Sequence, residues 1–212
     1  MITSRDISET KNYSISELNK PLLTLNFPQK KGINFASPTE TSLKSKKLIT
    51  LNTMDLRIGF GYDMHRLQKG RELWLGGIKI DHEMGLMGHS DADVLIHAIC
   101  DALLGAANLR DIGFHFPNTS AKYEHIDSKI LLKETYRLIQ EKGYRIGNID
   151  ATVCAEQPKL NPYIPEMQQT LATVLQTDEE NISIKATTSE KMGFVGRKEG
   201  IAAYAVALIR KM

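Results

Sequence analysis

The sequence has little of three features that would point to particular classes of protein. Its two cysteines, Cys100 and Cys154, are far apart and form no CxxC pair, which argues against a disulfide framework or a cysteine zinc knuckle and fits a reducing compartment. No stretch approaches the roughly 18 uninterrupted apolar residues of a membrane helix. The formal net charge of +2 is small, whereas nucleic-acid binding needs a concentrated basic patch. We therefore expect no membrane and no nucleic-acid partner.

What is present is typical of a globular protein, with 42% hydrophobic and 25% charged residues in 212. We expect one domain over residues 55–212. Residues 1–54 have a different composition, rich in Ser, Thr, Lys and Asn with no helical or strand period. Three interpretations of this extension stay open: a disordered segment, an upstream start chosen in error before Met54, or a targeting segment. The first two predict a bacterial cytoplasmic location, and a transit peptide would predict a plastid-like organelle.

Hydrophobic periodicity predicts strands and helices that alternate along the domain. The expected strands are 56–62, 73–80, 148–155, 181–187 and 200–210, and the expected helices are about 91–107, 128–142 and 163–176. Ser90 followed by Asp93 resembles a capping box, Asp127 and Gly143 bound the second helix, and prolines open the third. This order predicts an α+β fold in a single domain, with a mixed β-sheet and helices packed on one of its faces.

Two segments carry a candidate metal site. Asp63 and His65 project to the same side of an extended chain, and His97 lies on the first expected helix, one turn before Asp101. Three such ligands leave one zinc position open, as in catalytic zinc sites, and Asp101 could orient His97. A polar loop after a strand and a structural histidine remain the alternatives.

Other polar segments suit phosphates and a nucleotide. His89 and Ser90 stand at the start of the first helix, where free N–H groups favour an anion, although Ser90 could simply be the N-cap. Residues 187–190 offer three hydroxyls and a carboxylate for phosphates and a hard cation. Residues 155–162 could recognise the edge of a nucleobase through the N–H and C=O groups of an extended backbone. The alternative is that they are only a rigid connection between a strand and a helix.

Seven motifs then occur in order: GYDxH, GHSDADVLIHAxCDALLGA, RDIGxHFPxT, YRIGNIDATV, QPKL, IKATTSEKMGFVGR and EGIAAYAVALI. Over residues 56–211 the sequence thus resembles the 2-C-methyl-D-erythritol 2,4-cyclodiphosphate synthase family of isoprenoid precursor biosynthesis. The resemblance implies a phosphorus–oxygen lyase that assembles as a homotrimer with active sites between subunits. It implies conversion of 4-diphosphocytidyl-2-C-methyl-D-erythritol 2-phosphate to the 2,4-cyclodiphosphate and CMP, by attack of the 2-phosphate on the β-phosphate.

The resemblance also assigns roles to residues. It implies Zn²⁺ on Asp63, His65 and His97, a second cation, Mg²⁺ or Mn²⁺, on Glu190 and the substrate phosphates, and catalytic roles for His89 and Thr188. The substrate-binding positions around the metals and the methylerythritol are Asp63, Met64, His65, His89, Ser90, Asp111, Ile112, Gly113, Phe116, Pro117, Asn118, Thr119 and Ser120. The substrate-binding positions of the cytidine and phosphate pocket, which a neighbouring subunit contributes, are Ala155, Glu156, Gln157, Pro158, Lys159, Leu160, Asn161, Thr187, Thr188, Ser189 and Glu190. The positions beside the trimer channel are Phe194 and Arg197.

The chain departs from the family pattern in places. The family's FPDTD reads FPNTS here, so Asn118 and Ser120 replace two carboxylates, and Tyr204 stands where some relatives carry a channel glutamate. Two other functions stay open. One is a metal-dependent phosphohydrolase that uses zinc-bound water, and the other is a non-catalytic trimer that binds metal or nucleotide.

Overall fold

The computed structural model describes residues 55–120 and 123–212, so the expectations for residues 1–54 lie outside it. The main sheet has the strand order β4-β1-β7-β5-β6. Neighbouring strands are antiparallel except β5 and β6, which are parallel. The sheet is therefore mixed, as expected. Its strands are β1 (Leu56–Lys69), β4 (Met84–Met87), β5 (Tyr144–Cys154), β6 (Ile182–Thr187) and β7 (Gly200–Lys211).

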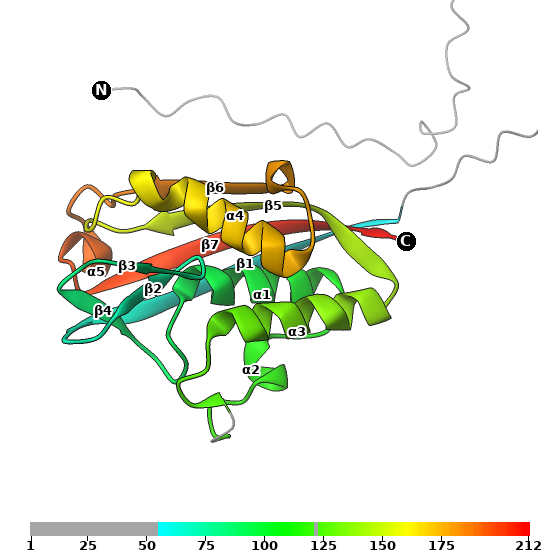
Figure 1. The fold of residues 1–212 in the computed structure, drawn as a ribbon, viewed down its shortest axis with the longest axis horizontal. Helices are drawn as coiled ribbons and strands as arrows, with labels where there is room; N and C mark the ends of the chain where they lie inside the picture. The colour runs from blue at the N-terminus through cyan, green and yellow to red at the C-terminus, as the bar shows by residue number, and fades with distance from the viewer. Residues whose placement is uncertain (1–54, 121–122) are drawn as a thin grey trace, which may run out of the picture. The chain divides into compact units, whose positions relative to one another are not determined.

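The helices lie on one face of this sheet (Figure 1). They are α1 (Val94–Ala106), α3 (Ser128–Glu141) and α4 (Ile164–Leu175), with the single-turn helices α2 (Ile112–His115) and α5 (Gly193–Gly196) between strands and helices. Short 3-10 turns span Asn161–Tyr163 and Glu179–Asn181. In the part of the chain that the structure describes, no helix is long and apolar enough to cross a membrane.

Three local expectations are corrected by the structure. The segment expected as one strand over 73–80 is a hairpin of β2 (Leu73–Leu75) and β3 (Ile78–Ile80), because Gly76 and Gly77 adopt positive φ and turn the chain. Strand β1 continues to Lys69, where it pairs with β4, which periodicity did not predict. The N-cap of α1 is Asp93 and not Ser90, since the Asp93 carboxylate accepts the Ile96 N–H.

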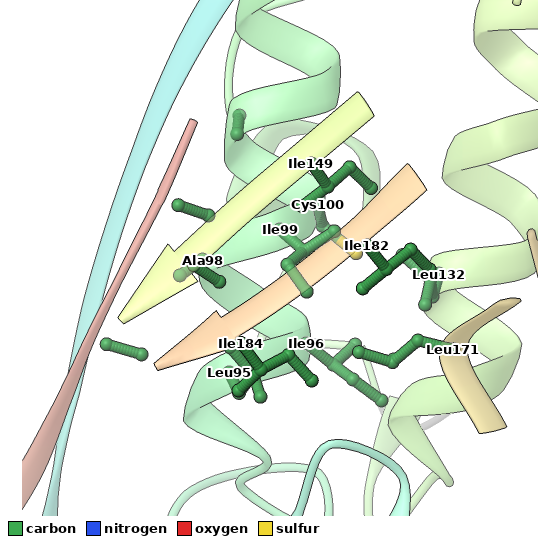
Figure 2. Packing of buried hydrophobic residues seen from close by; sticks show 14 of the residues in the cluster. Leu95, Ile96, Ala98, Ile99, Cys100, Leu132, Ile149, Leu171, Ile182 and Ile184 are labelled. Carbon is green, nitrogen blue, oxygen red and sulfur yellow. The ribbon is translucent and has the colours of Figure 1, made fainter. Parts of the chain in front are cut away.

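The core lies between the sheet and the three long helices. Figure 2 shows side chains of α1, such as Ile96 and Ile99, against Ile149 of β5 and Ile182 of β6, with Leu132 and Leu171 closing the layer from α3 and α4. Each such fully buried side chain contributes about 1.5–3 kcal/mol relative to exposure. This packing fixes α1, and therefore His97, relative to the sheet.

Helix α1 lies directly on β1 because two strand glycines have no side chain. A Cβ on Gly59 would lie 1.9 Å from the Ala102 carbonyl oxygen, and a Cβ on Gly61 would lie 1.9 Å from that of Ala98. Since backbone atoms cannot yield to such an overlap, glycine is required at both positions. The close approach brings the helix that carries His97 onto the strand that carries Asp63.

Gly61→Ala is accordingly expected to destabilise the protein and weaken the site. The added methyl group must push α1 off β1, a type of overpacking that costs about 1–3 kcal/mol or more. The measurement is the free energy of unfolding together with zinc affinity. Gly105→Ala is the control, because a Cβ there meets nothing within 4 Å, and a Gly61→Ala protein as stable as this control would contradict the packing.

Candidate metal centre and substrate pocket

Three side chains from β1 and α1 converge at one point. Asp63 Oδ2 lies 3.0 Å from His65 Nε2 and 3.0 Å from His97 Nδ1, and the two histidine nitrogens are 3.1 Å apart. Strand alternation places Asp63 and His65 on the same face, and Asp63 Oδ1 is held by the Met64 N–H. The predicted three-residue metal-binding group is therefore present in the structure.

The spacing of these atoms fits a zinc ion. Ligand atoms at about 2.0–2.1 Å from a tetrahedral zinc lie about 3.3 Å from one another, close to the observed separations. A carboxylate oxygen and two imidazole nitrogens also form the hard and borderline donor set that zinc accepts, with a fourth position left for substrate or water.

The pKa values of Asp63 and His97 show that these two side chains are electrostatically coupled. Burial by itself would raise the pKa of Asp63, but the hydrogen bonds and charges of His65 and His97 outweigh it and lower that pKa. Burial would lower the pKa of His97, but Asp63 outweighs it and raises that pKa. In the metal-free site, Asp63 and His97 therefore each favour the charged form of the other.

These shifts predict how the stability of the metal-free protein depends on pH. The lowered pKa of Asp63 stabilises the fold above about pH 3.9, its unfolded value, and the raised pKa of His97 stabilises it below about pH 6.5. The melting temperature of the chelated wild type minus that of His97→Gln should thus be largest between these values. It should shrink as pH rises through the raised pKa of His97, and a difference that grows with rising pH would contradict the pairing.

The contacts of the second ring nitrogen of His97, Nε2, correct another expectation. Asp101 does not orient His97, because its Oδ1 accepts the Ile112 N–H at 2.7 Å. Asp101 thus ties α1 to the start of α2. The Nε2 atom of His97 instead faces Ser128 Oγ at 3.0 Å and Ser90 Oγ at 3.1 Å. Periodicity had placed Asp101 on the correct helix face but could not say which segment would reach it first.

A pocket of about 380 Å³ lies beside the histidines. Two of its lining residues, Tyr123 and Leu131, were not found by sequence reasoning. The other ten lining residues were all expected from the sequence, and they are His65, His89, Ser90, His97, Ile112, Gly113, Phe116, Pro117, Asn118 and Thr119. His89 Nε2 also lies 3.2 Å from the Ser120 carbonyl oxygen, and Asp111 is the N-cap residue of α2. The pocket is therefore bounded by the α1 entry on one side and by the 112–119 loop on the other.

At the start of α1, two side chains of the same segment accept backbone N–H groups. The carboxylate of Asp93 is fully buried and accepts N–H groups from Gly76, Gly77 and Ile96. Ser90 Oγ accepts the Ala92 N–H. Of these donors only Ile96 belongs to α1, because Gly76 and Gly77 lie in the β2–β3 turn. Phosphate binding by His89 and Ser90 before this helix stays a prediction.

A second group of the expected residues lies at the end of β6. The Thr188 hydroxyl donates to Glu190 Oε1 at 2.7 Å, and Glu156 Oε1 accepts the Ser189 and Lys191 N–H groups at 3.1 Å each. Ala155 N donates to Thr187 O, so the 155–161 connection lies beside this loop. Within it, Gln157 accepts from Lys198, Leu160 is buried, and Pro158, Lys159 and Asn161 follow on the same connection to α4.

This second group does not line the pocket beside the histidines. Met64, Ala202, Cys154 and Thr187 lie in register across β1, β7, β5 and β6. Three strand spacings of about 4.8 Å each separate Thr187 from the metal-binding strand by about 14 Å. One chain therefore holds two separate groups of the expected residues, on β1–α1 and at the end of β6, which are called half-sites below.

The remaining expected residues are Met64, Phe194 and Arg197. Met64 projects to the opposite side of β1 from Asp63 and His65, and it is 53% exposed. Phe194 of α5 shares a small hollow with Met64 and His65. Arg197 follows α5 and pairs with Glu199 at 2.9 Å.

The fold and these contacts define the class of the protein: an α+β protein with a three-ligand metal centre in the wall of an open pocket. A family model described as the YgbB family matches residues 56–210. The chain therefore belongs to the YgbB family, which confirms the resemblance drawn from its motifs.

Individual relatives agree with this assignment. The chain is 70% identical over 159 residues to the 2-C-methyl-D-erythritol 2,4-cyclodiphosphate synthase of Parabacteroides distasonis, covering 75% of this chain and 99% of the relative. It is 66% identical over 158 residues to that of Bacteroides thetaiotaomicron, covering 74% and 99%. Among solved structures, a CDP complex of the Plasmodium falciparum protein is 38% identical with a TM-score of 0.66, covering 74% of this chain and 96% of that one.

Proposed function

We propose that this chain is an enzyme that converts 4-diphosphocytidyl-2-C-methyl-D-erythritol 2-phosphate to 2-C-methyl-D-erythritol 2,4-cyclodiphosphate and CMP, in isoprenoid precursor biosynthesis. The observation that carries this proposal is the convergence of Asp63, His65 and His97 beside the pocket, in a chain 70% identical to a synthase of that name. The CDP bound by a solved relative supports a nucleotide-linked substrate.

The reaction needs positioning more than proton transfer, because the attacking phosphate is already an anion. Zn²⁺ held by Asp63, His65 and His97, and Mg²⁺ or Mn²⁺ held by Glu190, would supply Lewis-acid stabilisation to phosphate oxygens when bound. His89 and Thr188 direct donors at the phosphates, while Asp111–Gly113 and Phe116–Ser120 wall the methylerythritol. Folding the substrate so that its own ends meet contributes about 7–11 kcal/mol through proximity.

The active enzyme in this proposal is a homotrimer whose sites lie between subunits. The two half-sites of one chain are too far apart to act on one phosphate pair, so residues 155–161 and 187–190 of a neighbour complete each site. The helix-free sheet face supports self-association, because it exposes a continuous apolar strip, a type of surface that marks interfaces. The strip, called the open sheet face below, consists of Ile58, Phe60, Tyr62, Met64, Tyr204 and Val206.

The proposal places the enzyme in the bacterial cytoplasm, with the cytidine-linked substrate and its own copies as partners. Bacterial relatives support this setting. The competing hydrolase reaction is distinguished by mass, because attack by water releases CMP and leaves the linear 2,4-bisphosphate, which carries one more water than the cyclic product. Mass spectrometry of the product mixture is the direct test, and the linear species alone would overturn the proposal in favour of the hydrolase.

Glu190→Gln should distinguish the contribution of the second cation from that of the zinc ion. Loss of the carboxylate removes the second cation and about 3 kcal/mol of transition-state stabilisation, so turnover should fall by about 100-fold. Zinc content should not change, since Glu190 is outside the Asp63 cluster. Turnover and bound zinc are measured beside Glu180→Gln, an exposed carboxylate of the Glu179–Asn181 turn, and unchanged turnover in Glu190→Gln would exclude this role.

A further inference from the structure

The Nε2 side of His97 meets a chain of two polar residues that the proposed reaction does not use. Ser128 Oγ lies 3.0 Å from His97 Nε2 and donates its proton to Asp91 Oδ1 at 2.5 Å. The Ser128 N–H donates to the other Asp91 oxygen, Oδ2, at 2.9 Å. Ser128 is fully buried as the first residue of α3, so water does not compete for its hydroxyl.

We propose that Ser128 and Asp91 act as positioning residues that fix the tautomer and ring orientation of His97 and so set the affinity of the metal site. This inference rests on metal binding in the proposed function and concerns residues that touch neither substrate nor metal. It assigns the α1–α3 contact a role in the chemistry of the site as well as in packing.

The direction of the protons follows from the donor inventory. An ionised carboxylate only accepts, and a serine hydroxyl has a single proton to give. Because Asp91 takes that proton, Ser128 Oγ presents a lone pair to His97 Nε2, which must then carry a hydrogen. A neutral imidazole with hydrogen on Nε2 leaves its Nδ1 lone pair free, and Nδ1 is the atom that lies 3.0 Å from Asp63 Oδ2.

Ser90 and Asp93 strengthen this arrangement. Ser90 Oγ lies 3.1 Å from the same His97 nitrogen and 3.4 Å from Ser128 Oγ, and so offers a second oxygen at Nε2. The Asp93 N–H donates to Asp91 Oδ1 at 3.2 Å and helps to hold that carboxylate in place. Both Asp91 oxygens therefore accept an N–H, and an amide at position 91 must leave one of these N–H groups facing an NH₂ group.

Ligating histidines commonly donate their other N–H to such a partner, and loss of the partner weakens metal affinity by about 10–100-fold. Ser128→Ala should therefore weaken zinc binding by about that factor while the protein stays folded. Asp91→Asn should weaken it as well. If Asp91 acts through Ser128, the double variant should bind zinc no more weakly than Ser128→Ala alone.

The matched control is Thr135→Val. Thr135 lies on the same helix and is also fully buried, but its hydroxyl lies beside Cys100 rather than beside His97 or Asp91. Zinc dissociation constants are measured by chelator competition on the intact protein, with circular dichroism to verify folding. In zinc-loaded protein labelled with ¹⁵N-histidine, the His97 Nε2 proton should exchange slowly with water in wild type and Thr135→Val, and rapidly in Ser128→Ala.

The outcomes separate this inference from the proposed function. Weaker zinc binding and faster Nε2–H exchange in Ser128→Ala, with Thr135→Val unchanged, support it. Wild-type zinc affinity in folded Ser128→Ala overturns the inference and leaves the proposed function intact. Additive losses of zinc affinity in the double variant overturn only the part of the inference that assigns a role to Asp91, and they too leave the proposed function intact. A wild-type protein that binds no zinc would instead overturn the proposed metal centre itself.

Discussion

His97→Ala is expected to lose its zinc and nearly all of its turnover. The substitution removes one of three ligand atoms that lie 3.0–3.1 Å apart, and two protein ligands do not form the three-ligand arrangement of catalytic zinc. Without the ion, the charge on the phosphates is no longer offset, and a loss of about 4 kcal/mol corresponds to about a 1000-fold fall in rate. Zinc content by atomic spectroscopy and CMP release are the measurements.

The control for this variant is His125→Ala. The His125 side chain is 75% exposed and lies outside the metal-binding group. This variant should keep wild-type zinc content and turnover, because it removes an imidazole from the surface only. An active His97→Ala enzyme without bound zinc would show that His97 is not a ligand and that the triad does not carry the reaction.

The second large effect is expected for Phe60→Asp on the open sheet face. Phe60 is 63% exposed in the single chain and lies opposite Val206 on β7. In the proposed trimer this side chain is buried against other copies, and an unpaired buried carboxylate costs several kcal/mol. The variant should therefore be monomeric by light scattering. It should lose turnover as well, because residues 187–190 of a neighbour no longer reach the triad.

Ile130→Asp provides the comparison for assembly. Ile130 is 56% exposed, but it lies on α3, away from the open sheet face. The same change of charge and polarity there should leave the trimer intact. Full activity in a monomeric Phe60→Asp protein would contradict a site shared between subunits.

The sequence was sufficient for the features that depend on local periodicity. Asp63 and His65 alternate with Met64 along a strand, so their shared direction could be predicted before any fold was known. Helix α3 begins after Asp127 and ends before Gly143, as predicted, because the Asp127 carboxylate accepts the Lys129 N–H and Gly143 adopts a positive φ. These signals lie within a few residues of the structure that they specify.

The features that were predicted wrongly depend on contacts between distant segments. Ser90 and Asp93 both suit an N-cap, and the choice fell to Asp93 because the β2–β3 turn supplies two further N–H donors, from Gly76 and Gly77. His97 meets Ser128 rather than Asp101, and Ser128 is 31 residues away in sequence. No periodicity in one segment carries information about such a partner.

The division of the expected site residues into two half-sites is a property of the sheet order. The motifs predicted that residues around 63, 97 and 190 act together, yet β7 and β5 separate β1 from β6 within one chain. Strand order is set by long-range pairing, so the sequence alone did not show this separation. The resemblance to a family with shared sites supplied the expectation that a neighbour closes the distance.

The central claim is a metal-dependent cyclisation, and phosphorus NMR of the intact protein with the cytidine diphospho substrate and Mg²⁺ tests it most directly. The spectrum should show CMP and a cyclic diphosphate. Both products should disappear after chelation and return when zinc is added. CMP with only the linear 2,4-bisphosphate, or full turnover in protein stripped of zinc, would contradict the account.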